Sequence, residues 1–190
     1  METPTNQAHF SEVSELLSIQ STESVNRLVK DIYDTLINGR SLFVCGNGGS
    51  SAIASHFVTD LVKIAIDRKL TFPVFALGSN PALMTMISND YGYEASFAYE
   101  LKAIGRQRDT LFAISSSGNS KNILNVVDFA NEVGIKTIGL VGFDGGLVAP
   151  RCSSILRVET PIGRYASVED VHSTVCHDIS IKLRAIVEKS

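Results

Sequence analysis

Strand-sized apolar segments alternate with helix-like segments over most of this chain. Two stretches with helical spacing come first, over residues 8–19 and 22–38. Apolar runs that favour strands follow at 41–45, 72–77, 110–115, 136–142 and 153–159. Segments with helical spacing separate most of these runs, and another closes the chain at 165–188. Strands that are apolar on both faces and joined by helices form parallel sheets covered on both sides.

The alternation predicts an α/β fold of three layers, in which helices cover both faces of a five-stranded parallel sheet. A length of 190 residues suits one domain, and no internal repeat or linker divides the chain. We therefore expect a single domain over 1–190, with an N-terminal helical segment (1–38) before the α/β core (39–190). Ligands in such sheets bind beyond the carboxyl ends of the strands.

Charge and composition exclude several classes of partner. With 17 basic and 20 acidic residues the net charge is -3, which gives no electrostatic basis for binding nucleic acid or an anionic membrane. The apolar runs are too short to span a bilayer, and the first residues lack the pattern of a secretory signal. Three widely spaced cysteines favour reduced thiols. We expect a cytoplasmic protein.

Two corners of the predicted sheet share one chemistry. "GNGGSS" (46–51) follows the first strand and "SSSGNS" (115–120) follows the third, and each opens a helix. Glycine permits close approach of the backbone, serine adds hydroxyl donors, and the free N–H groups of a helix start attract anions. Either corner alone could be an ordinary turn with a serine N-cap. Two in one sheet favour a phosphate ligand.

Nucleotide-binding motifs fit these corners poorly. No lysine follows the glycines as a P-loop requires, and Ser51 stands where a dinucleotide fingerprint has its third glycine. No acidic residue ends the second strand either, where Leu77 is followed by Gly78 and Ser79. We expect a small phosphorylated molecule and no nucleotide cofactor.

Four segments together resemble the sugar isomerase (SIS) domain: "GNGGSS", "AISSSGNS", "IGLVGFDGG" and "VEDVHSTVCH". "GNGGS-x5-HF", "SNDYGY" and the last histidine are more specifically similar to the phosphoheptose isomerases. The resemblance implies a flavodoxin-like SIS fold and conversion of sedoheptulose 7-phosphate to D-glycero-D-manno-heptose 7-phosphate. It also implies a homotetramer with active sites between subunits.

The resemblance also assigns roles by position. Substrate-binding residues would be Asn47, Gly48, Gly49, Ser50, Asp90, Ser115, Ser116, Ser117, Ser120 and Glu169. Asp60 and His177 would be catalytic. In some relatives zinc occupies the positions that match His56, Asp60, Glu169 and His177, so one divalent metal per site is a further expectation.

Several positions depart from the family pattern, including Ala166 and Ser167, which stand where an acidic and a basic residue are common. Asp60 stands where the family has glutamate, Glu169 where it has glutamine, and Ile64 where it has arginine. The phosphate end of the site therefore matches the family, whereas the sugar end is altered. An isomerase for another sugar phosphate, a non-catalytic sugar-phosphate sensor and a protein that binds a replication initiator remain alternatives.

The residue types suit a ketose–aldose isomerisation. The reaction moves a proton between adjacent carbons and another between two oxygens through an enediol, which suits a carboxylate base and a near-neutral histidine. His56 and Asp60 are four residues apart and share a helix face, which also suits a metal. Glu169 and His177 are eight residues apart, about 12 Å on an unbroken helix. One ion could take both only through extended side chains, a helix that begins later, or a neighbouring subunit.

Overall fold

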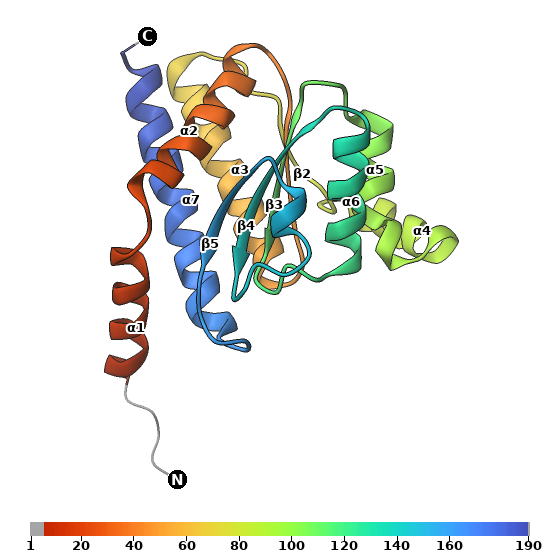
Figure 1. Cartoon of the computed structure of the whole chain (residues 1–190). Coiled ribbons are helices and arrows are strands. Elements are labelled where there is room, and N and C mark those ends of the chain that lie inside the picture. The colour runs from red at the N-terminus through yellow and green to blue at the C-terminus, as the bar shows by residue number, and fades with distance from the viewer. Residues whose placement is uncertain (1–5, 190) are drawn as a thin grey trace.

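A parallel sheet of five strands forms the centre of the computed structural model, which describes residues 6–189 (Figure 1). The strands are β1 (Leu42–Gly46), β2 (Val74–Ala76), β3 (Thr110–Ser115), β4 (Lys136–Gly142) and β5 (Ser154–Val158). Their order across the sheet is β2-β1-β3-β4-β5, and every neighbouring pair is parallel. The predicted fold is confirmed. β2 is shorter than the predicted strand at 72–77.

Helices cover both faces of this sheet. One layer contains α1 (Asn6–Ser18), α2 (Thr22–Ile37), α3 (Gly49–Arg68) and α7 (Tyr165–Val187). The opposite layer contains α5 (Ser96–Ile104) and α6 (Lys121–Glu132), with α4 (Pro81–Tyr91) at its outer edge (Figure 1). Short 3-10 helices lie at Tyr93–Ala95 and Ala149–Arg151. No helix of the described chain has the length and hydropathy to cross a membrane.

Side chains of each strand alternate between two hydrophobic cores. In β1, Leu42 and Val44 pack on the side of α2, α3 and α7, whereas Phe43 and Cys45 pack on the side of α5 and α6. All four are buried. Burial on both faces explains why the strands read as continuous apolar runs in the sequence. Both helical layers are thereby fixed relative to the strand ends that carry the two serine–glycine corners.

The helix α5 was not predicted from the sequence. Its nine residues bury only Ser96, Phe97 and Leu101, and the 3-10 helix at Tyr93–Ala95 leads directly into it. Phe97, Leu101 and Ile104 do follow a helical spacing, but nine residues are too short a window to establish the period. The tertiary contacts of Phe97 and Leu101 with the core beside β1 and β3 stabilise this helix instead.

Candidate active site

Both serine–glycine corners open onto one cavity at the carboxyl ends of β1 and β3. The cavity has a volume of about 180 Å³. It is lined by Asn47, Ser50, Ile114, Ser115, Ser116, Ser117, Ser120, Tyr165 and Glu169. Six of these were predicted as substrate-binding serines or as Asn47, and Glu169 was predicted as well. The structure therefore brings both predicted corners together, whereas Tyr165 was not predicted as part of the site.

The serine loop between β3 and α6 keeps some hydroxyl groups available to a ligand. Ser115 Oγ accepts from the Gly118 N–H at 3.1 Å, and Ser117 Oγ accepts from the Asn119 N–H at 3.2 Å. Ser116 Oγ is buried without a partner among the described residues. Ser120 begins α6 without a side-chain capping bond. A buried hydroxyl without a protein partner is costly, so a ligand that accepts a hydrogen bond from Ser116 would remove that cost.

A second glycine loop supports the serine loop from behind. Gly118 has φ +60°, and a Cβ there would overlap the backbone carbonyl group of Gly145. The Gly118 carbonyl oxygen accepts from the Val148 N–H at 2.9 Å, and Asn119 Oδ1 accepts from the Leu147 N–H at 3.1 Å. Residues 143–148, which follow β4, therefore fix the shape of the serine loop.

Asn47 joins the two corners through an amide network. Its Nδ2 donates to Asn122 Oδ1 at 2.9 Å, and Asn122 Nδ2 donates to Asn47 Oδ1 at 2.9 Å. The Tyr93 hydroxyl also donates to Asn47 Oδ1, at 2.8 Å. Asn122 is 2% exposed and lies in the first turn of α6. Sequence analysis missed its role, and its place two residues after Ser120 was the one available signal.

His56, Asp60 and His177 form a separate polar cluster between α3 and α7. Asp60 Oδ1 lies 3.6 Å from His56 Nε2, and Asp60 Oδ2 lies 3.9 Å from His177 Nε2. The two imidazole Nε2 atoms are 3.4 Å apart. One potential ligand atom from each residue lies within 4.8 Å of the others. Two imidazoles and a carboxylate at this spacing fit a divalent ion such as zinc and leave coordination positions for a substrate.

Glu169 lies apart from this cluster, although sequence analysis placed it among the metal ligands. Its carboxylate lines the serine cavity and covers Gly49, where a Cβ would overlap Glu169 Oε2. The helix α7 runs unbroken from Tyr165 to Val187, so a later helix start does not bring Glu169 towards His177. One chain thus assembles three of the four predicted metal ligands.

Asp90 also lies outside the serine cavity. It is exposed near the end of α4, and its Oδ1 accepts from Asn89 Nδ2 at 2.8 Å. Asp90 thus does not line the serine cavity of its own chain, and its contact with substrate stays a prediction.

Burial keeps two side chains of α7 uncharged. Burial lowers the pKa of His172 to about 4, and a weaker contact with the backbone of Val141 only partly offsets this shift. Burial, with a smaller effect of the Asp60 carboxylate, raises the pKa of the Cys176 thiol. Both groups stay neutral at physiological pH. His172 is buried in the core, whereas His177 lies in the polar cluster with His56 and Asp60.

Comparison with known families agrees with this arrangement. The family profile of the SIS domain matches residues 7–142. The chain belongs to the SIS domain family. The β1 and β3 corners of this SIS protein lie inside the matched range, whereas Glu169 and His177 follow it.

Individual relatives narrow the position of the chain within the family. This SIS protein is 36% identical to the phosphoheptose isomerase of Helicobacter pylori over 163 residues, which cover 83% of each chain. It is 33% identical to the phosphoheptose isomerase of Aliarcobacter butzleri over 180 residues, covering 93% of this chain and 94% of that protein. The structure of the Neisseria gonorrhoeae phosphoheptose isomerase superposes with a TM-score of 0.85, at 31% identity and coverage of 94% and 96%. These matches place the SIS protein among the phosphoheptose isomerases.

Proposed function

We propose that this SIS protein isomerises sedoheptulose 7-phosphate to D-glycero-D-manno-heptose 7-phosphate. The observation that carries the proposal is the pairing of a serine-lined cavity with a His–Asp–His cluster on the same two helices. The helix α3 starts at the β1 corner and bears His56 and Asp60, and α7 bears Glu169 in the cavity and His177 in the cluster.

The serine cavity is suited to the phosphate of the substrate. Ser116 and Ser120 supply hydroxyl donors, and the backbone N–H groups at the start of α3 and α6 add to the attraction for an anion. None of the residues that line the cavity is cationic. Binding through hydroxyl and backbone donors holds the phosphate while the sugar chain extends out of the cavity.

The cluster supplies the groups that move protons. Asp60 takes a proton from C1 of the ketose and returns one to C2, which passes through an enediol. His177 moves a proton from the hydroxyl oxygen on C1 to the oxygen on C2, so that the carbonyl group changes place. The substrate gains and loses no atoms overall, and both side chains end in their starting protonation state.

A divalent metal fits the same cluster. His56, Asp60 and His177 would hold it. Glu169 would be a further ligand only if it came from another subunit, because within one chain it lies in the serine cavity. When bound, the metal supplies polarisation of the substrate carbonyl. With a metal bound, Asp60 would need one free carboxylate oxygen to accept the carbon-bound proton, and His177 would need a ring nitrogen that does not bind the metal to move the proton between the oxygens.

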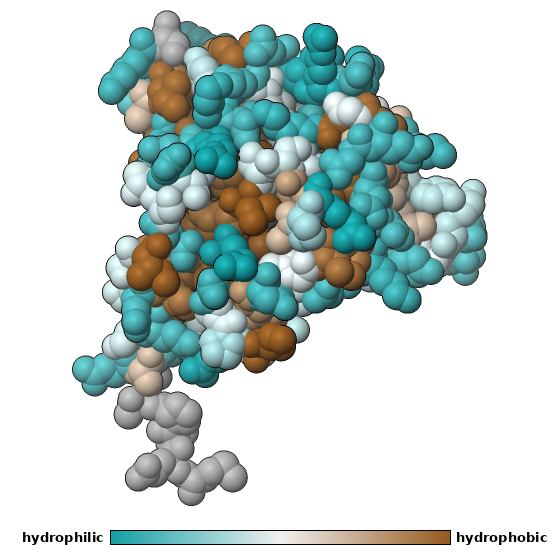
Figure 2. Space-filling model, in the orientation of Figure 1, coloured by the Kyte–Doolittle hydropathy of each residue, from teal (hydrophilic) through white to brown (hydrophobic). Residues whose placement is uncertain are grey.

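We further propose a homotetramer that works in the cytoplasm and completes its active sites between subunits. The distance between Glu169 and His177, about 12 Å along one helix, separates the two halves of the site within one chain. Apolar side chains lie exposed on the neighbouring helices, with Phe10 of α1 at 68% and Ile181 of α7 at 66%. Figure 2 shows hydrophobic patches on the face that carries α1 and β5. Three free cysteines fit a reducing compartment.

Proton exchange in heavy water tests the proposed function. Sedoheptulose 7-phosphate should take up deuterium in the presence of the protein, as measured by NMR. Asp60→Asn and His177→Asn should slow uptake about a hundredfold or more. Asp128→Asn and His9→Asn change an exposed carboxylate and an exposed imidazole outside the site, and they should keep the full rate.

The pattern across substrates distinguishes the alternatives. Uptake only into a shorter ketose phosphate would assign a different sugar to the same reaction. Tight binding of sugar phosphates without deuterium uptake would contradict isomerisation and support a sensor. Neither binding nor uptake would contradict both and favour a protein-binding role.

A further inference from the structure

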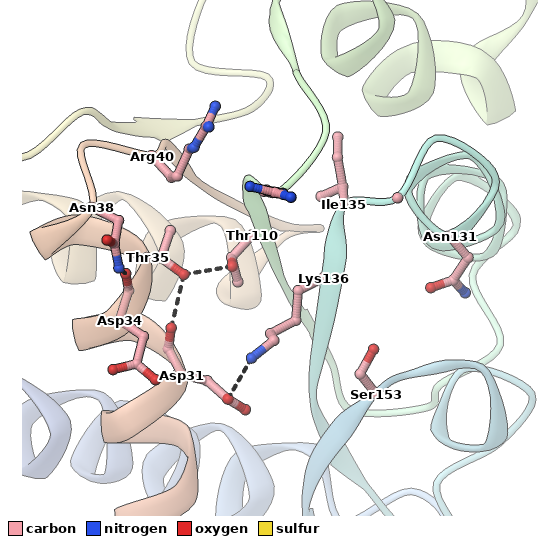
Figure 3. A pocket seen from close by; sticks show the side chains of 12 residues that line it. Asp31, Asp34, Thr35, Asn38, Arg40, Thr110, Asn131, Ile135, Lys136 and Ser153 are labelled. Carbon is pink, nitrogen blue, oxygen red and sulfur yellow. Dashed lines mark hydrogen bonds and ion pairs between the residues drawn. The ribbon is translucent and has the colours of Figure 1, made fainter.

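A larger cavity lies at the opposite edge of the sheet, where the strands begin. It is lined by the first residues of β3 and β4, Thr110 and Lys136, and by the end of α2 (Figure 3). Its volume of about 740 Å³ lies within the range of small-molecule sites. The whole length of β3, about 17 Å, separates it from the serine cavity. It is therefore distinct from the site described above.

The acidic side chains of this cavity are already neutralised. Lys136 Nζ donates to Asp31 Oδ1 at 2.6 Å (Figure 3). Lys30, outside the lining, pairs with Asp34. Asp31 Oδ2 also accepts from the Ser154 hydroxyl at 2.8 Å. Both carboxylates are therefore engaged with protein groups, and they leave the other cations of the cavity without a counter-charge.

Two arginine side chains in the lining have no such partner. Among the described residues, neither the Arg40 nor the Arg108 guanidinium makes a hydrogen bond or an ion pair. The charged residues that line the cavity are Arg40, Arg108 and Lys136, which are cationic, and Asp31 and Asp34, which are anionic. The lining therefore has a net charge of +1, whereas the whole chain has a net charge of -3. A guanidinium group without a carboxylate partner is suited to phosphate, which it binds through parallel N–H donors.

The backbone holds both arginines in fixed positions. Asp109 is 2% exposed, and its carboxylate accepts from the Ser41 N–H at 2.9 Å and the Arg106 N–H at 2.7 Å. These bonds clamp the segment after Arg40 to the segment around Arg108. Arg108 itself has φ +72°, a left-handed conformation that disfavours a side chain as large as arginine. The fold thus keeps an arginine where glycine or asparagine would be less strained.

We propose that this cavity binds a small phosphorylated metabolite that carries hydroxyl groups. Arg40 and Arg108 contact the phosphate. Asn38, Asn131 and Ser153 complete the polar wall of the cavity beside the rest of the molecule (Figure 3). The Asn38 Nδ2 already donates to the Asp34 carbonyl oxygen and the Asn131 amide bonds to Arg151 and Thr137, so these side chains shape the wall and the arginines bind. The cavity is too large for an inorganic ion alone, which is why a hydroxylated body is part of the assignment.

Backbone amide NMR separates this site from the serine cavity, because the two sets of amides are far apart. Titration with inorganic phosphate and with glucose 6-phosphate should shift the amides of 39–41, 107–110 and 134–136. The sugar phosphate should bind there more tightly than phosphate. Arg40→Gln and Arg108→Gln should each weaken binding about tenfold. Arg27→Gln, an exposed arginine elsewhere on α2, should leave it unchanged.

Shifts at 115–120 report the serine cavity and should persist in the Arg40→Gln/Arg108→Gln double variant. The proposal is overturned if the amides at the beginning of the strands do not respond to millimolar ligand, or respond equally in the double variant. Equal affinity for phosphate and glucose 6-phosphate would overturn the assignment of a hydroxylated ligand.

Discussion

At the residue scale, Glu169 departs from the family pattern, which has glutamine at this position. Its carboxylate lines the cavity that we assign to a phosphate dianion. Ser115 and Ser116 of that cavity are each 5% exposed, so solvent only partly screens the repulsion between the Glu169 carboxylate and the phosphate, which are both negative. A neutral glutamine would keep the shape and remove the repulsion. We therefore expect Glu169 to weaken phosphate binding.

Glu169→Gln should therefore bind inorganic phosphate about fivefold more tightly than the natural protein, since removal of one like charge relieves about 1 kcal/mol. Isothermal titration calorimetry measures the change. Glu132→Gln, at the exposed end of α6, is the matched control and should leave the affinity unchanged. Unchanged or weaker binding by Glu169→Gln would show that the carboxylate does not face the phosphate.

At the element scale, the loops after β3 and β4 act as one unit. Gly118 approaches Gly145 so closely that no side chain fits between them, whereas Gly39 has a similar φ of +65° and open space around it. These two glycines share the conformational requirement and differ only in packing. A pair of alanine substitutions therefore separates packing from backbone strain.

Gly118→Ala should lower the free energy of unfolding by more than about 2 kcal/mol, because the backbone of both loops must move. Gly39→Ala should lower it by about 1 kcal/mol, from the left-handed conformation alone. Urea denaturation measures both. Equal losses would contradict the role of the Gly145 contact in shaping the serine loop.

The Asn47–Asn122 amide pair is a second link between elements. Asn122→Ala leaves the Asn47 amide without its buried partner, which should cost about 1–3 kcal/mol and raise KM more than it lowers kcat. Tyr93→Phe should have the same effect on KM, more weakly, because one of the bonds to Asn47 is lost.

Steady-state kinetics and thermal denaturation of the same samples measure these effects. Asn125→Ala, on the same helix, removes a single exposed bond to the Glu94 carbonyl oxygen and should change neither parameter. A fall in kcat with unchanged KM in Asn122→Ala would contradict a role in positioning the phosphate corner.

Sequence patterns predicted the elements with strong periodicity and the corners whose chemistry is local. β1, β3 and β4 were predictable because both of their faces are buried, which gives continuous apolar runs. The serine loop was predictable because its glycine and serine residues are typical of an anion-binding turn. The contact between Asn47 and Asn122 spans 75 residues, so no local pattern reveals it. The separation of Glu169 from the His–Asp–His cluster depends on where α7 begins, and the eight-residue spacing between Glu169 and His177 could not determine that.

At the scale of the whole molecule, His172 links stability to pH. This imidazole is fully buried in the core, with its pKa lowered from 6.5 to about 4 by burial. Between pH 6.5 and pH 4, His172 binds a proton in the unfolded chain but not in the folded chain. The free energy of unfolding therefore falls as the pH drops from 6.5 to 4.

The free energy of unfolding should fall by about 3 kcal/mol between pH 7 and pH 4 from this residue alone. His172→Leu, which cannot titrate, should show a shallower loss over the same interval in urea denaturation. His9→Leu, an exposed imidazole paired with Asp170, is the control. Parallel pH profiles of His172→Leu and the natural protein would contradict the linkage.

A crystal structure of Asp60→Asn with sedoheptulose 7-phosphate tests the central claim most directly, because that variant should bind the sugar and not convert it. We expect the phosphate against Ser116 and Ser120, and the C1–C2 end beside position 60 and His177 of the same or a neighbouring subunit. Phosphate bound elsewhere, or a carbonyl end remote from every copy of His177, would contradict the account.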